Sequence, residues 1–359
     1  MPEKATRAQI RRHNRQLVLR FLYLEEATNR AALAQKTGLT KPAVSTIVAE
    51  LIEEGLIEEI GLGESTDSGG KRPRLLRFVP EARQVVGIEI AEDHLRGVLT
   101  NLDGQVIVQH HAELEPGQKA FSAVFPILLE VINGLIAQCS APLLCIGAGV
   151  PGLVDTVNGE VIYSARFGWH EVALAEPLQK HYRVPVYVSN DTQLASMAQY
   201  AFGNLTESES VNSFATVLVG GTVGMGLIQR ESRAYQGGEI SFLRPDGVTS
   251  LADLLGWDFV RRRMDELGLT HADGSLYASD LSYLYIRQAV ENGSEPALVL
   301  WEELSESLAT VFAWVIALTH PEHISLAGRI ADLGEGFLAR VIEKTGERVL
   351  PYLLQQTGF

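Results

Sequence analysis

The chain has 359 residues, of which 46% are hydrophobic and 21% are charged, and its formal net charge at pH 7 is −14. A chain of this length usually holds more than one hydrophobic core, so two or three domains are expected. No apolar run reaches the roughly 18 residues that a membrane helix needs, and the polar N-terminus lacks an apolar signal core. We therefore expect the chain to stay in the cytoplasm without a membrane partner.

The charge is distributed unevenly along the sequence. Residues 1–80 contain 13 Lys and Arg and 10 Asp and Glu, whereas residues 81–359 contain 17 and 34. The basic residues of the first part gather before Glu25 and again between Lys71 and Arg77. A small basic head on an acidic body is typical of a DNA-binding protein whose body repels phosphate.

The first 80 residues predict three helices and a β-hairpin. Asn29 and Thr40 are suitable N-caps for the second and third helices, and Gly38 permits the tight turn between them. A loop rich in glycine, serine and basic residues lies between the two β-like runs. This order predicts a winged helix-turn-helix. The helices are expected at Arg7–Leu24, at Arg30–Thr37 and from Thr40 to Glu54, and the strands at Leu56–Ile60 and Leu75–Val79.

The third helix of this head has two distinct faces. Apolar residues recur with helical spacing from Val44 to Ile52, which indicates a core stripe. Short or basic residues lie on the other face and suit a DNA groove. An alternative is a packing module or a protein-interaction winged helix, but the two basic clusters favour DNA because phosphate contact requires cations. The residues predicted to contact DNA are Arg11, Lys41, Ser45, Thr46, Arg72 and Arg74.

The remainder predicts two α/β halves. The first begins with a three-stranded meander whose second turn, Asp103-Gly104, is a strong hairpin signal. The second begins with a hairpin around Gly220-Gly221-Thr222. Strands in such folds hold ligands near their carboxyl ends. Other strands are expected at Leu143–Val150, Val184–Ser189 and Ile324–Ala327, and helices at Ala120–Gln138, near Val172–His181, between Ser250 and Leu318, and at the C-terminus.

Several segments resemble the ROK family (repressor, ORF, kinase), which groups sugar-responsive repressors with bacterial sugar kinases. The head motif RRHNRQLVLRFL is similar to the heads of xylose and N-acetylglucosamine repressors. The other matching segments are GAGVPGLVDTVNGEVIYSARFGW (147–169), VPVYVSNDTQLASMAQYAFG (184–203), VGGTVGMGLIQRESRAYQGGEISF (219–242) and LTHPEHISLAGRI.

The resemblance implies an α/β fold class: a winged helix-turn-helix followed by a two-lobed actin/hexokinase-like (ribonuclease H-like) ATPase fold. The expected domains are 1–82 for the head, 83–189 for a small lobe, and 190–359 for a large lobe with an oligomerisation surface and a C-terminal helix. It also implies a homodimer or tetramer, because two-fold heads read paired half-sites.

The same resemblance implies a set of sugar-binding residues. Asp191 matches the general base of the kinases, and Asn190 and Glu239 match sugar-contacting positions. In a sensor these groups only exchange hydrogen bonds with hydroxyls. Asn190 and Asp191 also suit a helix N-cap, and Trp169 suits either a sugar face or the core. The sugar-binding residues implied are Pro151, Gly152, Trp169, Asn190, Asp191 and Glu239.

Two departures from the family bear on function. The kinase phosphate loop, Asp-x-Gly-Gly-Thr, is replaced by Glu89-Ile90-Ala91-Glu92-Asp93, whose carboxylates repel a triphosphate. The glycines near Gly220 remain, but a tight hairpin explains them equally well. The family's zinc-binding cysteines are absent and Phe242 stands at the histidine position, so no metal site is expected. We expect Phe242, Leu243 and Leu251 to hold that loop by packing.

The favoured interpretation is a sugar-responsive repressor that binds operator DNA and has no catalytic residues, cofactor or metal. One alternative is an active sugar kinase with a fused DNA-binding head. Another is a constitutive DNA-binding protein whose degenerate sensor only oligomerises. The altered first loop argues against the kinase, and the retained Asn190, Asp191 and Glu239 argue against the sensor-less protein.

Overall fold

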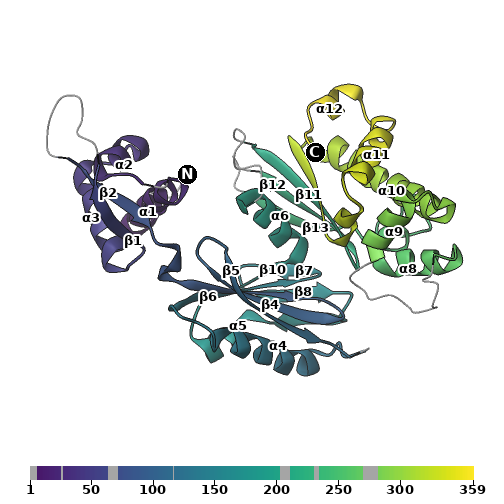
Figure 1. Cartoon of the computed structure of the whole chain (residues 1–359). Helices are drawn as coiled ribbons and strands as arrows, with labels where there is room; N and C mark the ends of the chain where they lie inside the picture. The colour runs from purple at the N-terminus through teal and green to yellow at the C-terminus, as the bar shows by residue number, and fades with distance from the viewer. Residues whose placement is uncertain are drawn as a thin grey trace. The chain divides into compact units, whose positions relative to one another are not determined.

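The structure is a computed structural model, and it describes residues 6–25, 27–63, 72–115, 117–202, 211–229, 234–269 and 282–359 (Figure 1). The chain forms two compact units, each of which is described by itself below. One unit comprises residues 1–88, 95–112 and 126–147, and the other comprises residues 89–94, 113–125 and 148–359. Within the described residues, no helix is long and apolar enough to cross a membrane.

The head has the predicted winged helix-turn-helix architecture. Its helices are α1 (Arg7–Leu24), α2 (Arg30–Thr37) and α3 (Lys41–Glu53), and β1 (Ile57–Leu62) pairs antiparallel with β2 (Arg74–Phe78). The Asn29 side chain accepts from the backbone N–H groups of Ala31 and Ala32, and the Thr40 hydroxyl accepts from Ala43 N. Gly38 ends α2 with φ 68°, a conformation that favours glycine. These local signals therefore act as the sequence predicts.

The core of the head unites all of its elements. Its buried residues come from α1, α2, α3 and the hairpin, and the α3 contribution is the predicted apolar stripe, with Val44, Val48 and Leu51 fully buried. The opposite face of α3 is exposed. The core residues are Val18, Leu22, Leu33, Ala34, Val44, Ile47, Val48, Leu51, Ile57 and Leu76.

The first body sheet has five strands in the order β10-β6-β3-β4-β5. The short helix η1 (Pro80–Ala82) leads into it. The predicted meander is present, and the strand expected at Leu143–Val150 has those bounds in the structure. The bounds are β3 (Gln84–Ile90), β4 (His94–Asn101), β5 (Val106–Glu113), β6 (Leu143–Val150) and β10 (Val186–Asn190), with helices α4 (Phe121–Ile136) and α5 (Ala175–Tyr182).

A small three-stranded sheet lies between β6 and α5 in the sequence and was not predicted. Its strands, β7 (Leu153–Asp155), β8 (Glu160–Ser164) and β9 (Trp169–Ala173), pair antiparallel in chain order. The predicted helix near Val172–His181 was wrong at its start, because Val172 pairs with Val161 in this sheet and α5 begins only at Ala175.

The second large sheet has the order β13-β12-β11-β14, in which β14 runs parallel to β11. Its strands are β11 (Ser213–Val219), β12 (Val223–Gln229), β13 (Ala234–Glu239) and β14 (His323–Ala327). The helices of this region are α6 (Asp191–Phe202), α7 (Ala252–Leu255), α8 (Trp257–Glu266), α9 (Ser282–Glu291), α10 (Glu295–Thr319), η3 (Arg329–Leu333), α11 (Glu335–Gly346) and α12 (Pro351–Gln355).

Helices cover both faces of this second sheet (Figure 1). On one face, Val217, Val219 and Val223 join a core built with α7 to α11. On the other, α6 approaches so closely that a Cβ at Gly224 would lie 2.1 Å from the Thr192 hydroxyl, and one at Gly226 would lie 1.8 Å from that of Ser196. These two glycines of the glycine-rich segment therefore serve helix packing.

Candidate functional site

Three of the predicted polar residues meet where strands end. Asn190 ends β10, Asp191 begins α6 and Glu239 ends β13. Asn190 Nδ2 donates to Gly152 O at 3.0 Å and to Glu239 Oε1 at 3.2 Å, and Gly152 N donates to the same Glu239 oxygen at 3.1 Å. Four of the six predicted sugar-binding residues thus lie in one cluster, since Asp191 follows Asn190 directly and its charge acts on that of Glu239.

Asn190 and Asp191 also fix the start of α6. Asn190 Oδ1 accepts from Gln193 N at 3.1 Å, and Asp191 Oδ1 accepts from Thr192 N at 2.7 Å. The helix-cap interpretation is therefore confirmed, but capping occupies only part of each side chain. Among the described residues, none donates to Asp191 Oδ2.

The carboxyl groups of the cluster have perturbed acidity. Burial raises the pKa of Asp191 to about 6, and the nearby Glu239 and Glu89 carboxylates add to this shift, whereas the bond from Thr192 N opposes it. Burial also raises the pKa of Glu239, against the bonds from Gly152 and Asn190 and the charge of Arg166. Near neutral pH, Asp191 is therefore mainly a desolvated carboxylate, a strong acceptor for a hydroxyl.

Gly152 has the strictest backbone requirement of the cluster. Its φ of 128° is one that side chains disfavour, and a Cβ there would lie 2.3 Å from Tyr163 O. Because both its N–H and its carbonyl bond to the cluster, Gly152 orients Glu239 and Asn190. Pro151, the residue before it, is buried.

Trp169 lies in an aromatic group. Its side chain is only 3% exposed and packs between Phe121 and Phe167, with ring centroids 5.5 and 4.5 Å away. Its Nε1–H donates to Lys119 O at 2.6 Å. This burial favours the core interpretation of Trp169 over stacking on a sugar.

The Glu89–Asp93 segment, which the resemblance aligned with the kinase phosphate loop, is a tight turn between β3 and β4, closed by a bond from Ala91 N to His94 O at 2.9 Å. Glu92 in this turn is paired with Lys119 and with Arg166, and Arg166 also donates to Gly221 O. Asp93 pairs with the His94 ring at 2.7 Å, and Asp93 together with Glu89 raises the pKa of His94 to about 9.

The loop after β13, where the resemblance placed the zinc module of the family, is held by hydrogen bonds. The expected packing was wrong for Phe242 and Leu243, which are 62% and 46% exposed, and right for Leu251, which is fully buried. Asp246 accepts from Val248 N at 2.8 Å and from Thr249 N at 2.6 Å, and these bonds lower its pKa to about 2. Among the described residues, no group of three His, Cys, Asp or Glu side chains is arranged to hold a metal ion.

The predicted DNA-contacting residues are exposed on the head. Lys41, Ser45 and Thr46 lie on the outer face of α3, as the helical period predicts. Two arginines are engaged by acidic neighbours: Arg11 pairs with Glu50 at 2.5 Å, and Arg74 pairs with Glu59. Arg72 begins the described part of the chain after the loop and is exposed, whereas Lys71 and the loop tip lie outside the described residues.

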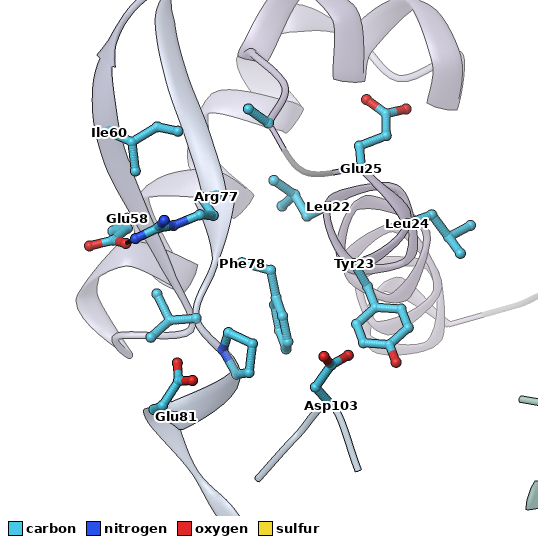
Figure 2. A pocket seen from close by; sticks show the side chains of 13 residues that line it. Leu22, Tyr23, Leu24, Glu25, Glu58, Ile60, Arg77, Phe78, Glu81 and Asp103 are labelled. Carbon is cyan, nitrogen blue, oxygen red and sulfur yellow. Dashed lines mark hydrogen bonds and ion pairs between the residues drawn. The ribbon is translucent and has the colours of Figure 1, made fainter. Parts of the chain in front are cut away.

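A pocket that the sequence did not predict lies beside the head, with a volume of about 740 Å³ (Figure 2). Its walls are the end of α1, the β1–β2 hairpin, η1 and the turn that carries Asp103. The Tyr23 ring packs edge-on against Phe78 at 5.6 Å. Burial raises the pKa of Tyr23, and Asp103 raises it further as its hydrogen-bond partner. The contact of Tyr23 with Asp103 therefore joins the head to the β4–β5 turn.

Comparison with protein families and relatives agrees with this architecture. Residues 85–239 match the model described as ROK family, and residues 17–64 match the model described as MarR family. The xylose repressor of Bacillus spizizenii is 31% identical over 222 residues, which is 61% of this chain and 56% of that protein. The chain therefore spans little more than half the length of this relative. The xylose repressor of Caldicellulosiruptor bescii is 25% identical over an alignment that covers 93% of this chain and 88% of that protein.

Solved structures confirm the predicted fold class. A ROK family transcriptional regulator, described as a homolog of the E. coli MLC protein, matches with a TM-score of 0.79 and 20% sequence identity. The match covers 97% of this chain and 91% of the regulator's chain. A ROK family glucokinase from Streptomyces griseus, solved with glucose and AMPPNP, matches with a TM-score of 0.63 and 18% identity over 74% of this chain and 90% of its own. At such identities the likeness is one of fold.

Proposed function

We propose that this chain, whose residues 85–239 match the model described as ROK family, is a transcriptional regulator that binds operator DNA and responds to a small sugar. The observation that carries the proposal is the cluster of Gly152, Asn190 and Glu239 beside Asp191, held on the same chain as a winged head. Repression is the favoured direction, because the relatives named above are repressors.

The head supports DNA binding through its chemistry. Lys41, Ser45 and Thr46 form an exposed face on a helix whose opposite face is core, which is how a recognition helix meets the major groove. Arg72 and Arg74 border the wing, and Arg11 lies on α1. These arginines suit phosphate, whereas the short α3 side chains suit base edges.

The body supports sugar binding through its paired donors and acceptors. Asp191 offers an ionised oxygen, and Asn190 and Glu239 are already ordered by Gly152, so little side-chain entropy is lost when a hydroxyl binds. One charge-assisted hydrogen bond contributes about 1.5–3 kcal/mol. Pro151 lies next to Gly152 in the chain and is buried.

We further propose that the chain does not phosphorylate its sugar. The proposal is supported by the short β3–β4 turn, whose Glu92 and Asp93 carboxylates the resemblance aligns with the glycine-rich phosphate loop of the kinases. The alternative, a sugar kinase with a fused head, requires that ATP approach these carboxylates. We also propose a homodimer or tetramer, because regulators with such heads read paired half-sites.

A thermal-shift screen of monosaccharides tests the ligand proposal, because a ligand that binds only the folded state raises the melting temperature. We expect at least one pentose, hexose or amino sugar to stabilise the wild type, and Asp191→Asn to lose most of that shift. Asp258→Asn, at an exposed position on α8, is the control.

ADP-release assays with the same sugars are expected to show no turnover, and clear phosphorylation of any of them supports the kinase alternative.

A further inference from the structure

Two cations beside the proposed sugar site are held by one carboxylate of the chain itself. Lys119 Nζ bonds to one oxygen of Glu92, and Arg166 Nη1 donates to the other at 2.8 Å. Burial by itself raises the pKa of Glu92, but the two cations outweigh burial and lower it. Glu92 is therefore an ionised group with both oxygens occupied.

Arg166 connects this ion-paired group to the sugar site. Its Nη2 donates to Gly221 O in the β11–β12 turn, and its charge lowers the pKa of Glu239. Glu239 in turn accepts from Asn190 and Gly152. The positive charge of Arg166 therefore acts on the same carboxylate that is proposed to bind the sugar.

The arrangement is that of an oxyanion site. An ammonium and a guanidinium that converge on two oxygens match phosphate as well as carboxylate, because guanidinium groups bind both with paired N–H donors. The three side chains are 26–39% exposed, so the group is open to exchange with solvent. Gly220 and Gly221 leave open space beside it, since a Cβ at either would meet no atom within 4 Å.

We propose that Glu92 determines ligand specificity by filling this oxyanion site, so that the protein accepts uncharged sugars and rejects sugar phosphates and free phosphate. The tethered carboxylate is present at a high effective concentration, so a free anion must displace it. Glu92, Asp93 and Glu239 would also repel a phosphate dianion. The predicted rejection of phosphate rests on the ion-paired group of Glu92, Lys119 and Arg166 and on the carboxylates near it. The predicted acceptance of sugar rests on the proposed function.

The decisive variant is Glu92→Ala, which leaves Lys119 and Arg166 without their shared anion. Inorganic phosphate is the probe, titrated against chloride at constant ionic strength while melting temperature and calorimetric binding are measured. We expect phosphate to bind Glu92→Ala about tenfold or more tightly than the wild type, as charge-assisted bonds are regained. Glu176→Ala, which also removes a carboxylate paired with a lysine, is the matched control and is expected to show no gain.

A second variant shows which residues hold the phosphate. Glu92→Ala combined with Arg166→Ala is expected to lose the gain, because one of the two cations is gone. If Glu92→Ala does not fold, Glu92→Gln keeps the shape, removes the charge and is expected to show a smaller gain. Phosphate binding to the wild type as tight as to the variants, or no gain in a folded Glu92 variant, overturns the proposal.

Sugars separate this proposal from the proposed function. Glucose and N-acetylglucosamine are compared with their 6-phosphates on the wild type and on Glu92→Ala. For each sugar, we divide the affinity for the 6-phosphate by the affinity for the parent sugar. We expect this ratio to be about tenfold or more higher in Glu92→Ala than in the wild type. If no sugar binds either protein, the proposed function fails while the phosphate result still stands. A wild type that prefers a 6-phosphate overturns the role of Glu92.

Discussion

Several residues of the candidate site suited two interpretations in the sequence, one structural and one functional. Asn190 and Asp191 were candidates both for sugar contact and for a helix cap; the structure shows them at the start of α6 as caps, and their contact with sugar stays a prediction. The burial of Trp169 depends on Phe121 and Phe167, whose proximity the sequence does not reveal. Phe242 was expected to pack, but the local bonds of Asp246 hold its loop instead.

Asp191 is expected to reduce stability at neutral pH. Its pKa is raised to about 6 in the folded protein from 3.8, so its contribution to folding is complete below pH 4 and is lost as pH rises through 6. Asp191→Asn is uncharged at every pH and keeps an oxygen for Thr192 N. We expect its free energy of unfolding to exceed that of the wild type by up to about 3 kcal/mol at pH 8.

Urea denaturation at pH 5, 6, 7 and 8 measures this effect. The difference in free energy of unfolding between Asp191→Asn and the wild type is expected to grow between pH 5 and pH 7 and to stay constant above pH 7. For the exposed Asp258→Asn, the free energy of unfolding is expected to stay close to that of the wild type at every pH. An advantage that does not vary with pH argues against a buried, ionised Asp191.

At the scale of elements, strong periodicity and capping residues predicted most helices and strands. The head was predicted closely, because Asn29, Gly38 and Thr40 mark its helix ends locally. The sheet of β7, β8 and β9 was missed, because its strands have only three to five residues and their pairing is a tertiary effect. The glycines of β12 resembled a phosphate loop, and only the position of α6 shows that they serve packing.

Gly226 and Gly220 are expected to differ sharply in their tolerance of a methyl group. At Gly226 a Cβ would lie 1.8 Å from the Ser196 hydroxyl and 2.8 Å from Thr192 O, whereas at Gly220 it would meet open space. We expect Gly226→Ala to lower the free energy of unfolding by about 1–3 kcal/mol. Gly220→Ala is expected to stay within about 0.5 kcal/mol of the wild type. Chemical denaturation measures both, and equal losses would contradict the packing role.

At the scale of the whole molecule, charge separates the head from the body. This division is visible in the sequence alone, because residues 81–359 hold 34 acidic residues against 17 basic ones. Such a body repels DNA, so binding is expected to depend on the few cations of the head. The pocket between Tyr23 and Asp103 could not be predicted, because it joins segments about eighty positions apart in the chain.

The two arginines of the wing are expected to contribute unequally to DNA affinity. Arg74 must release Glu59 before it meets a phosphate, which offsets part of the gain, whereas no such acid holds Arg72 within the described residues. Arg72→Ala is expected to flatten the dependence of log affinity on log salt by roughly one unit. Arg74→Ala is expected to weaken binding less. Fluorescence anisotropy across a salt series measures both, and a larger loss for Arg74→Ala would contradict the assignment.

The central claim is that a sugar at Asp191 controls the head, and coupling between the two is measured directly by DNA affinity with and without sugar. The assay uses a labelled fragment from upstream of the chain's own gene and the sugar that gives the largest thermal shift. We expect sugar to change DNA affinity by about 5–150-fold for the wild type and to change it little for Asp191→Asn. A wild type that retains no DNA at low salt, or an Asp191→Asn variant that responds as strongly as the wild type, would contradict it.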